Sequence, residues 1–138
     1  MKYAVLLSAL LLSAAAFAAP PKTRLLDFST ETLISDEAAK AVLTEHIPAK
    51  VWKIYPANKW VFLSQVEGGI TAAGVCVITA RVMLLPLTPT MKAVLLRPEK
   101  IATAFDSQAG ATLDACRALA KTKLVEATNA VVSALVKV

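Results

Sequence analysis

The stretch Ile70–Leu85, ITAAGVCVITARVMLL, decides the fold that we expect for this 138-residue chain. Successive side chains of a β-strand point to opposite faces, so alternate residues share a face. One set here mixes threonine and arginine with apolar residues, whereas the other is apolar or small throughout. The stretch therefore predicts a strand that is covered on one face and partly solvated on the other. The covered set is Ile70, Ala72, Gly74, Cys76, Ile78, Ala80, Val82 and Leu84.

The chain has two cysteines, Cys76 and Cys116, and a single histidine. In an exported chain, two cysteines are most simply one disulfide. A redox pair would usually have the spacing Cys-x-x-Cys, and a zinc site would need two further ligands. We therefore predict a structural disulfide and no metal site. Closing a loop of roughly 40 residues would contribute about 4 kcal/mol in the chain-entropy model.

Residues 1–18 have the pattern of a bacterial signal peptide. Lys2 supplies a positive charge, Val5–Leu12 an apolar run, and Ala16-Phe17-Ala18 a small-x-small cleavage motif. The run is too short for a transmembrane helix, and an uncleaved anchor is the alternative. We expect cleavage after Ala18, a periplasmic or secreted protein, and a single domain over residues 19–138.

Charge limits the partners of the mature chain. The full chain has a formal net charge of +5, and loss of Lys2 leaves 5 − 1 = +4. Such a mild excess is compatible with an anionic envelope surface but too small to indicate nucleic-acid binding. No further apolar run is long enough to cross a bilayer, so we do not expect an integral membrane protein.

The segment before residue 50 predicts a short edge strand and a helix. Leu25–Thr30 is the candidate strand. Ser35 is a good N-cap, and Asp36 and Glu37 follow it in the first turn, where the helix dipole favours acidic side chains. Pro48 lies beyond the end of the helix.

Residues 50–85 predict a meander of strands. Pro56–Lys59 is a turn candidate between strands at Val51–Tyr55 and Trp60–Val66. Glu67–Gly69 is a second turn candidate, since glycine permits positive φ. Sixteen residues in one straight strand would span about 53 Å, which is too long for this domain, so we expect a bend or bulge near Ala73–Gly74.

After a connecting loop that begins at Pro86, two further strands are expected, Lys92–Arg97 and Lys100–Asp106. Alternation in the second of them predicts an inward face. Its members are Ile101, Thr103 and Phe105.

The C-terminal segment, from about Ser107 or Thr112 onward, predicts one long amphipathic helix. Its apolar line advances by threes and fours through Leu113, Cys116, Ala120, Leu124, Ala127, Val131, Leu135 and Val138. A second stripe contains Val125 and Val132 at heptad spacing with Val136 beside it. This stripe either widens the core-facing arc or forms a seam for a dimer or another partner.

These elements together predict an α+β domain. We expect an antiparallel meander of four or five strands, an N-terminal helix, and a long C-terminal helix packed on the sheet. The disulfide Cys76–Cys116 would join that helix to the sheet. Neither strand order nor oligomeric state follows from the pattern.

The segment Lys50–Trp60 is the main candidate for a binding surface, because it places aromatic side chains among cations. Such a surface can bind carbohydrate, anionic lipid heads or a protein by stacking, cation–π contact and charge. The alternative is that the aromatics fill the core while the lysines protect an edge hairpin. The candidate residues are Trp52, Tyr55, Trp60, Lys50, Lys53 and Lys59.

No catalytic constellation is evident. His46 is the only histidine, and its place near a helix C-terminus fits a half-buried residue better than a general base. Asp36 and Glu37 are consecutive and diverge on a helix, so they are not a paired acid and base. The sequence also has no phosphate-binding loop, HExxH or EF-hand pattern.

We therefore predict a non-enzymatic protein-binding or accessory module of the bacterial envelope that needs no cofactor. It would act as an inhibitor, an immunity-type protein or an assembly factor. One alternative is a carrier of a small apolar ligand or lipid in a pocket between helix and sheet. A second alternative is a small envelope hydrolase that depends on His46.

Overall fold

The computed structural model describes residues 19–136. The predicted signal peptide and Val138, the end of the predicted helical line, lie outside these residues. In chain order the elements are β1 (Leu25–Asp27), α1 (Asp36–His46), α2 (Ala49–Ile54), β2 (Trp60–Ile70), β3 (Val75–Pro86), β4 (Lys100–Ala109) and α3 (Leu113–Leu135).

The predicted α+β class is confirmed, with a four-stranded sheet in the order β1-β2-β3-β4. β2, β3 and β4 form the expected antiparallel meander. β1 pairs with β2 in parallel, so the sheet is mixed and the prediction of a purely antiparallel sheet was wrong. The physical reason is the connection: α1 and α2 lie between β1 and β2, and a long helical crossover returns the chain in the same direction.

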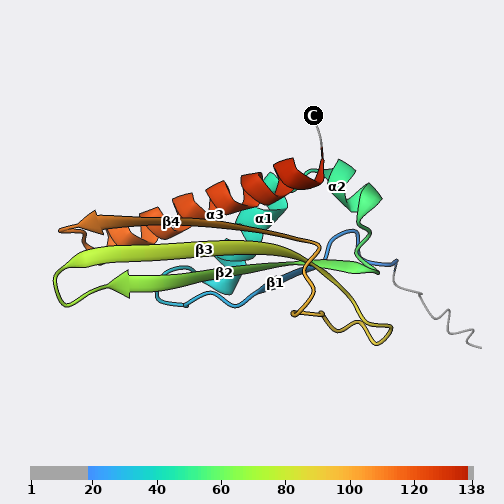
Figure 1. The fold of residues 1–138 in the computed structure, drawn as a ribbon, viewed down its shortest axis with the longest axis horizontal. Helices are drawn as coiled ribbons and strands as arrows, with labels where there is room; N and C mark the ends of the chain where they lie inside the picture. The colour runs from blue at the N-terminus through green and yellow to red at the C-terminus, as the bar shows by residue number, and fades with distance from the viewer. Residues whose placement is uncertain (1–18, 137–138) are drawn as a thin grey trace, which may run out of the picture.

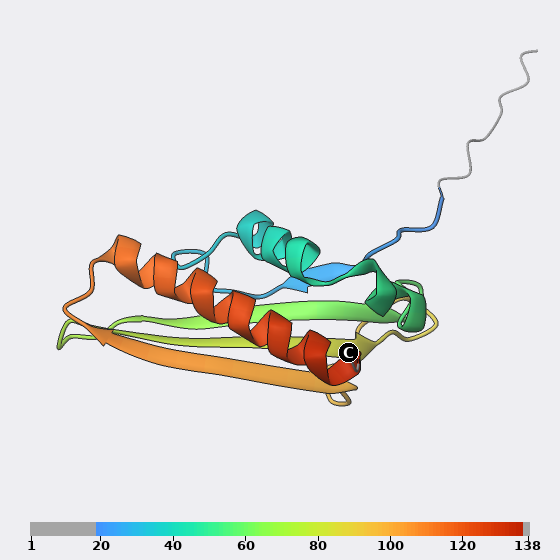
Figure 2. The same cartoon turned by 90° about the horizontal axis from the view of Figure 1, so that it is seen from above.

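The helices cover one face of the sheet. Figure 1 shows α1 and α3 on the same side of the strands, while the loop between β3 and β4 lies on the other side. Seen from above, α3 crosses the sheet obliquely with α1 beside it (Figure 2). Among residues 19–136, no helix covers the other face, and side chains there depend on the β3–β4 loop for burial.

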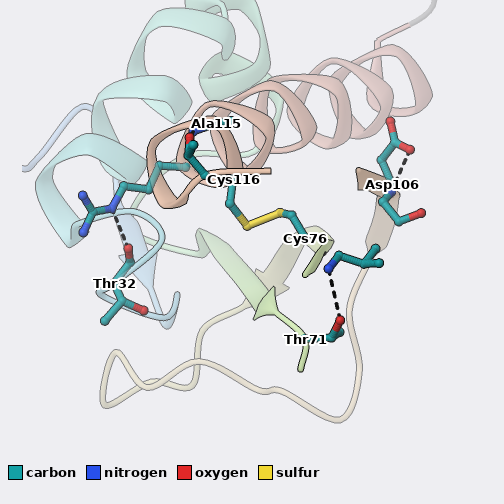
Figure 3. Close-up of a disulfide and its surroundings, with 10 residues drawn as sticks. Thr32, Thr71, Cys76, Asp106, Ala115 and Cys116 are labelled. Carbon is teal, nitrogen blue, oxygen red and sulfur yellow. Dashed lines mark hydrogen bonds between the residues drawn. A yellow bond between two sulfur atoms is a disulfide. The ribbon is translucent and has the colours of Figure 1, made fainter. Parts of the chain in front are cut away.

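The alternation predicted for Ile70–Leu85 holds along β3, where the predicted inward face is buried against α3. Figure 3 shows the disulfide between Cys76 and Cys116, whose Cα atoms lie 5.6 Å apart, which confirms the predicted bond. It joins the beginning of β3 to the first turns of α3. The fully buried residues that continue the core along these two elements are Ile78, Ala80, Val82 and Leu84 from β3 and Ala120, Leu124, Ala127 and Val131 from α3.

Helix α1 begins as predicted, with the Ser35 hydroxyl accepting a hydrogen bond from the Ala38 N–H at 3.2 Å. β1, however, is shorter than the predicted Leu25–Thr30. The Asp27 carboxylate accepts hydrogen bonds from the Ser29 N–H at 3.2 Å and the Ser29 hydroxyl at 2.6 Å. The Phe28 and Thr30 N–H groups still donate to β2 carbonyls, at 2.9 and 2.8 Å. The Val66 N–H, however, donates to the Ser29 hydroxyl at 2.9 Å and not to a backbone carbonyl, so the regular ladder of β1 ends at Asp27.

The hairpin predicted from Val51–Tyr55 is absent, because that segment forms the short helix α2. Val51 is fully buried, whereas Lys53, two residues further on, is exposed. A strand would place both on one face, so a helix over the core fits this burial better. Pro48, in extended conformation, is the N-cap and the Tyr55 N–H donates to the Val51 carbonyl at 2.8 Å. The aromatic residues of Lys50–Trp60 therefore lie on a helix and the turn that follows it.

The predicted turn at Glu67–Gly69 was also wrong, because β2 continues through these residues to Ile70. The hairpin turn falls instead at residues 71–74, where Gly74 has a φ of 76° and the Gly74 N–H donates to the Thr71 carbonyl at 2.9 Å. The expected bend near Ala73–Gly74 is thus the turn itself. Ile70–Leu85 is accordingly the end of one strand, a turn and most of the next strand.

Two predictions for the β3–β4 region were wrong. Lys92–Arg97 forms no strand, and its loop pairs only through an isolated bridge between Leu87 and Ala93. Ile101 and Phe105 point away from the helices and are exposed, while Ala102 and Ala104 take the inward positions. The reason is the close approach of α3, which leaves room for alanine but not for phenylalanine on this part of the sheet.

Removing the disulfide should destabilise the fold. We expect the double substitution Cys76→Ala and Cys116→Ala to lower the free energy of unfolding by about 4 kcal/mol, because the loop it closes spans a sequence separation of 40. Urea unfolding of both proteins under oxidising conditions measures this difference. Equal midpoints would contradict a stabilising role.

The neighbouring glycines of β2 provide a second test. Gly68 and Gly69 have φ values of 130° and 147°, but a Cβ on Gly68 would lie 1.9 Å from the Val77 carbonyl oxygen, while one on Gly69 meets nothing within 4 Å. Both alanine variants carry backbone strain. We expect Gly68→Ala to cost about 2 kcal/mol more than Gly69→Ala, because only it overpacks the strand pair. Equal thermal unfolding of the two variants would argue against this clash.

Candidate functional site

An open groove of about 690 Å³ lies where α1, α2 and residues 20–23, here called the leader, meet. It is the candidate functional site, because it is concave, largely apolar and contains part of the predicted aromatic–basic surface. The residues that line it are Pro20, Pro21, Lys22, Thr23, Thr44, Ile47, Ala49, Trp52, Lys53, Pro56, Ala57 and Asn58.

Backbone hydrogen bonds fix the helical walls of the groove. The Ile47 N–H donates to the Leu43 carbonyl at 2.9 Å and closes α1, and Pro48 then starts α2 at once. At the other end, the Lys59 N–H donates to the Pro56 carbonyl at 2.9 Å. The corner between the two helices and the turn into β2 is therefore tightly constrained.

The leader forms the remaining wall and is tied down at Arg24. The Arg24 Nε donates to the Ala57 carbonyl at 2.9 Å, and the Arg24 carbonyl accepts from the Phe62 N–H at 3.1 Å. The segment 20–23 continues directly from this anchor into the groove. Pro20 and Pro21, which stiffen an extended chain, are the sequence signal for this wall.

Trp52 belongs to both the groove and the core. Its ring packs edge to face on the buried Phe62, with the centroids 5.2 Å apart and an interplanar angle of 75°. Tyr55 and Trp60 form a second edge-to-face pair at 5.3 Å. All three are half-buried and contact the main core, and of the three only Trp52 lines the groove.

Of the predicted cations, some line the groove and others lie elsewhere on the surface. Lys53 lines the groove, joined by Lys22, whereas Lys50 and Lys59 are exposed but are not among its lining residues. None of the described lining residues is an aspartate or glutamate. The groove therefore combines an apolar, partly aromatic floor with positive potential, which favours an anionic ligand.

The predicted helical stripe is only partly available to a partner. Val125, Val132 and Val136 are half-buried and pack against the main core. The neighbouring Asn129 Oδ1 lies 3.2 Å from the His46 Nδ1, so this side of α3 faces α1. The predicted interface on α3 stays a prediction, with less free surface than the helical pattern indicated.

The polar side chains of His46 and Ser64 contact neighbouring elements of the fold. In the hydrogen bonds described for it, His46 meets an amide rather than a nucleophile or carboxylate. Ser64 donates its hydroxyl to Asp27 Oδ1 at 2.6 Å, an interaction that fastens β1 to β2. Within residues 19–136, no group of three or more His, Cys, Asp or Glu side chains is placed to hold a metal ion.

At the border of α3 and β4, Lys123 Nζ lies 2.6 Å from Glu126 and 3.5 Å from Asp106. The hydrogen bond with Glu126, together with the charges of both carboxylates, raises the pKa of Lys123 above its usual value against the opposing effect of burial. Its ammonium group therefore stays charged at neutral pH, and any stabilisation it gives would be lost only in strongly alkaline solution.

Comparisons with known proteins identify no family for this chain. No family model matches the chain, and no curated protein matches it. Among solved structures, a PelC dodecamer from Paraburkholderia phytofirmans has a TM-score of 0.43 and 12% identity, covering 80% of this chain and 89% of that one. A point-substituted variant of the PelC dodecamer has a TM-score of 0.45 and 10% identity, covering 78% and 86%. Likenesses this distant carry no argument about function.

Over residues 19–136, no helix has both the length and the hydropathy that crossing a bilayer requires.

The position of Trp52 gives a testable separation of core and surface roles. We expect Trp52→Ala to lower the free energy of unfolding by about 2 kcal/mol, because it removes the ring that packs on Phe62. Lys53→Ala, one residue further along α2, should change it by less than about 0.5 kcal/mol. Urea unfolding measures both, and an unchanged Trp52→Ala variant would place that ring outside the core.

Proposed function

We propose that this protein is an exported, non-enzymatic binding module of the bacterial envelope, whose groove between α1, α2 and the leader receives an acidic segment of a protein partner. The observation that carries the proposal is the lining of the groove, where Trp52 lies beside Lys53 and Lys22 without a carboxylate. An inhibitor, an immunity-type protein or an assembly factor would each use such a site.

The shape and chemistry of the groove favour an extended peptide. Its apolar floor, formed by residues such as Ile47 and Ala57, accepts side chains, and Asn58 and Thr44 offer polar groups along the rim. Lys53 and Lys22 would pair with aspartate or glutamate of the partner. Because the helical corner is already fixed, little conformational entropy is lost on binding.

Action outside the cytoplasm is part of the proposal. The disulfide Cys76–Cys116 fits folding in an oxidising compartment such as the periplasm. The predicted signal peptide, which lies outside the described residues, would deliver the chain there.

Reversing the charge at the groove should abolish partner binding. We expect the immobilised protein to retain a partner from periplasmic extract and Lys53→Glu to lose it, because the substitution repels an acidic segment. Lys121→Glu, an exposed charge reversal on α3, is the matched control and should bind as the unchanged protein does. Equal retention by Lys53→Glu would contradict the site.

Native mass spectrometry of the gently purified protein separates the competing functions. A co-purifying lipid would support the carrier, which would then use the apolar floor of the groove. A protein partner would support the binding module, and a homodimer would indicate that a second copy of the chain is the partner. A hydrolytic activity that disappears in His46→Ala without loss of folding would support the alternative of a small envelope hydrolase.

A further inference from the structure

The loop between β3 and β4, residues 87–99, carries the most exposed apolar side chain of the described chain. Leu96 is 94% exposed and its neighbour Leu95 is 53% exposed. Isolated apolar residues on a surface need no explanation, but two consecutive leucines this exposed form a surface that water solvates poorly.

The leucines are not required by the turn in which they lie. The Arg97 N–H donates to the Val94 carbonyl at 3.4 Å, so Leu95 and Leu96 occupy the two central positions of a turn. Glycine and proline favour such positions through their backbone conformation, and asparagine, aspartate and serine through hydrogen bonds to the nearby backbone. Leucine has neither property. Local folding therefore gives no reason for two leucines here.

The turn that carries these leucines is anchored to the end of β3 on both sides. The Val94 N–H donates to the Pro86 carbonyl at 2.9 Å, and the Glu99 N–H donates to the Leu84 carbonyl at 2.8 Å. Leu87 and Ala93 pack on a second, smaller core cluster on the sheet face away from the helices. Its members are Val61, Leu63, Met83 and Leu85.

Cations flank the exposed leucines in the sequence. Lys92, Arg97 and Lys100 are exposed within a few residues of Leu95–Leu96, and Glu99 is the single carboxylate of the segment 87–100. Exposed leucines flanked by lysine and arginine match the interface of an anionic bilayer, with the leucines among the acyl chains and the cations at the headgroups.

We propose that the β3–β4 loop docks this protein on an anionic phospholipid surface through Leu95 and Leu96. The Leu96 side chain is almost wholly in solvent, so a protein partner would need a fitted pocket for it, whereas a lipid interface accepts exposed leucines without one. The loop lies on the side of the sheet opposite the helices (Figure 1). Docking there leaves the helical face uncovered. The proposal shares the export expected of the binding module but does not depend on its groove.

Vesicle sedimentation tests the proposal with the chain that begins at Ala19 and contains every described element. The probes are phosphatidylcholine vesicles with and without phosphatidylglycerol. We expect binding to the anionic vesicles only, weakened by added salt. Replacing both leucines, Leu95→Ser with Leu96→Ser, should lower the partition coefficient by at least about tenfold, since two inserted side chains are lost.

Matched variants separate the apolar and ionic contributions. Ile54→Ser changes a comparably exposed apolar residue, 57% exposed, on α2, and should bind like the unchanged protein. Arg97→Glu should weaken binding to anionic vesicles, and Lys121→Glu on α3 should not. Circular dichroism should show native folding for the double leucine variant, because both side chains are exposed.

Several outcomes would overturn the proposal. These are an absence of binding to anionic vesicles, equal binding by the double leucine variant, and equal binding to neutral vesicles. Cross-linking of the loop to an envelope protein, without vesicle binding, would also overturn it in favour of a protein partner. The Lys53→Glu variant should keep vesicle binding, so failure of the groove and failure of the loop can be distinguished.

Discussion

The close approach of α3 to the sheet is the constraint on which the rest of this structure depends. The disulfide brings the Cα atoms of Cys76 and Cys116 to 5.6 Å at one end of the contact. Small residues continue it: Ala80 and Ala104 on the strands and Ala120 and Ala127 on the helix are all buried in the same cluster. Larger side chains at these positions would push the two layers apart.

That close contact decides where the larger apolar side chains go. Because α3 leaves space only for alanine on the inward side of β4, Phe105 and Ile101 are on the uncovered face. The larger side chains of the same core come from β2, β3 and the helices, among them Phe62, Ile78 and Leu124. Trp52 reaches this core through its contact with Phe62. The groove is therefore positioned by the same packing that closes the core.

The two proposed binding surfaces use different chemistry in a consistent way. The groove is concave and offers an apolar floor beside Lys53 and Lys22, whereas the β3–β4 loop exposes Leu95 and Leu96 in a segment that also carries exposed cations. A concave site discriminates by shape, and exposed leucines flanked by cations suit a fluid interface. A small envelope protein can in this way hold a partner while resting on a membrane.

The amino-acid sequence by itself determined the features that rest on local pattern: the alternation of β3, the capped start of α1, the amphipathic α3, and the pairing of the two cysteines. Tertiary structure decided what those patterns leave open. Val51–Tyr55 became helical because burying Val51 over the core outweighs β-propensity, and Gly68–Gly69 stayed in β2 because pairing with β3 continues past them. The groove joins the leader to residues more than 20 positions away in the chain. Local periodicity carries no information about such contacts, since they depend on how distant segments pack.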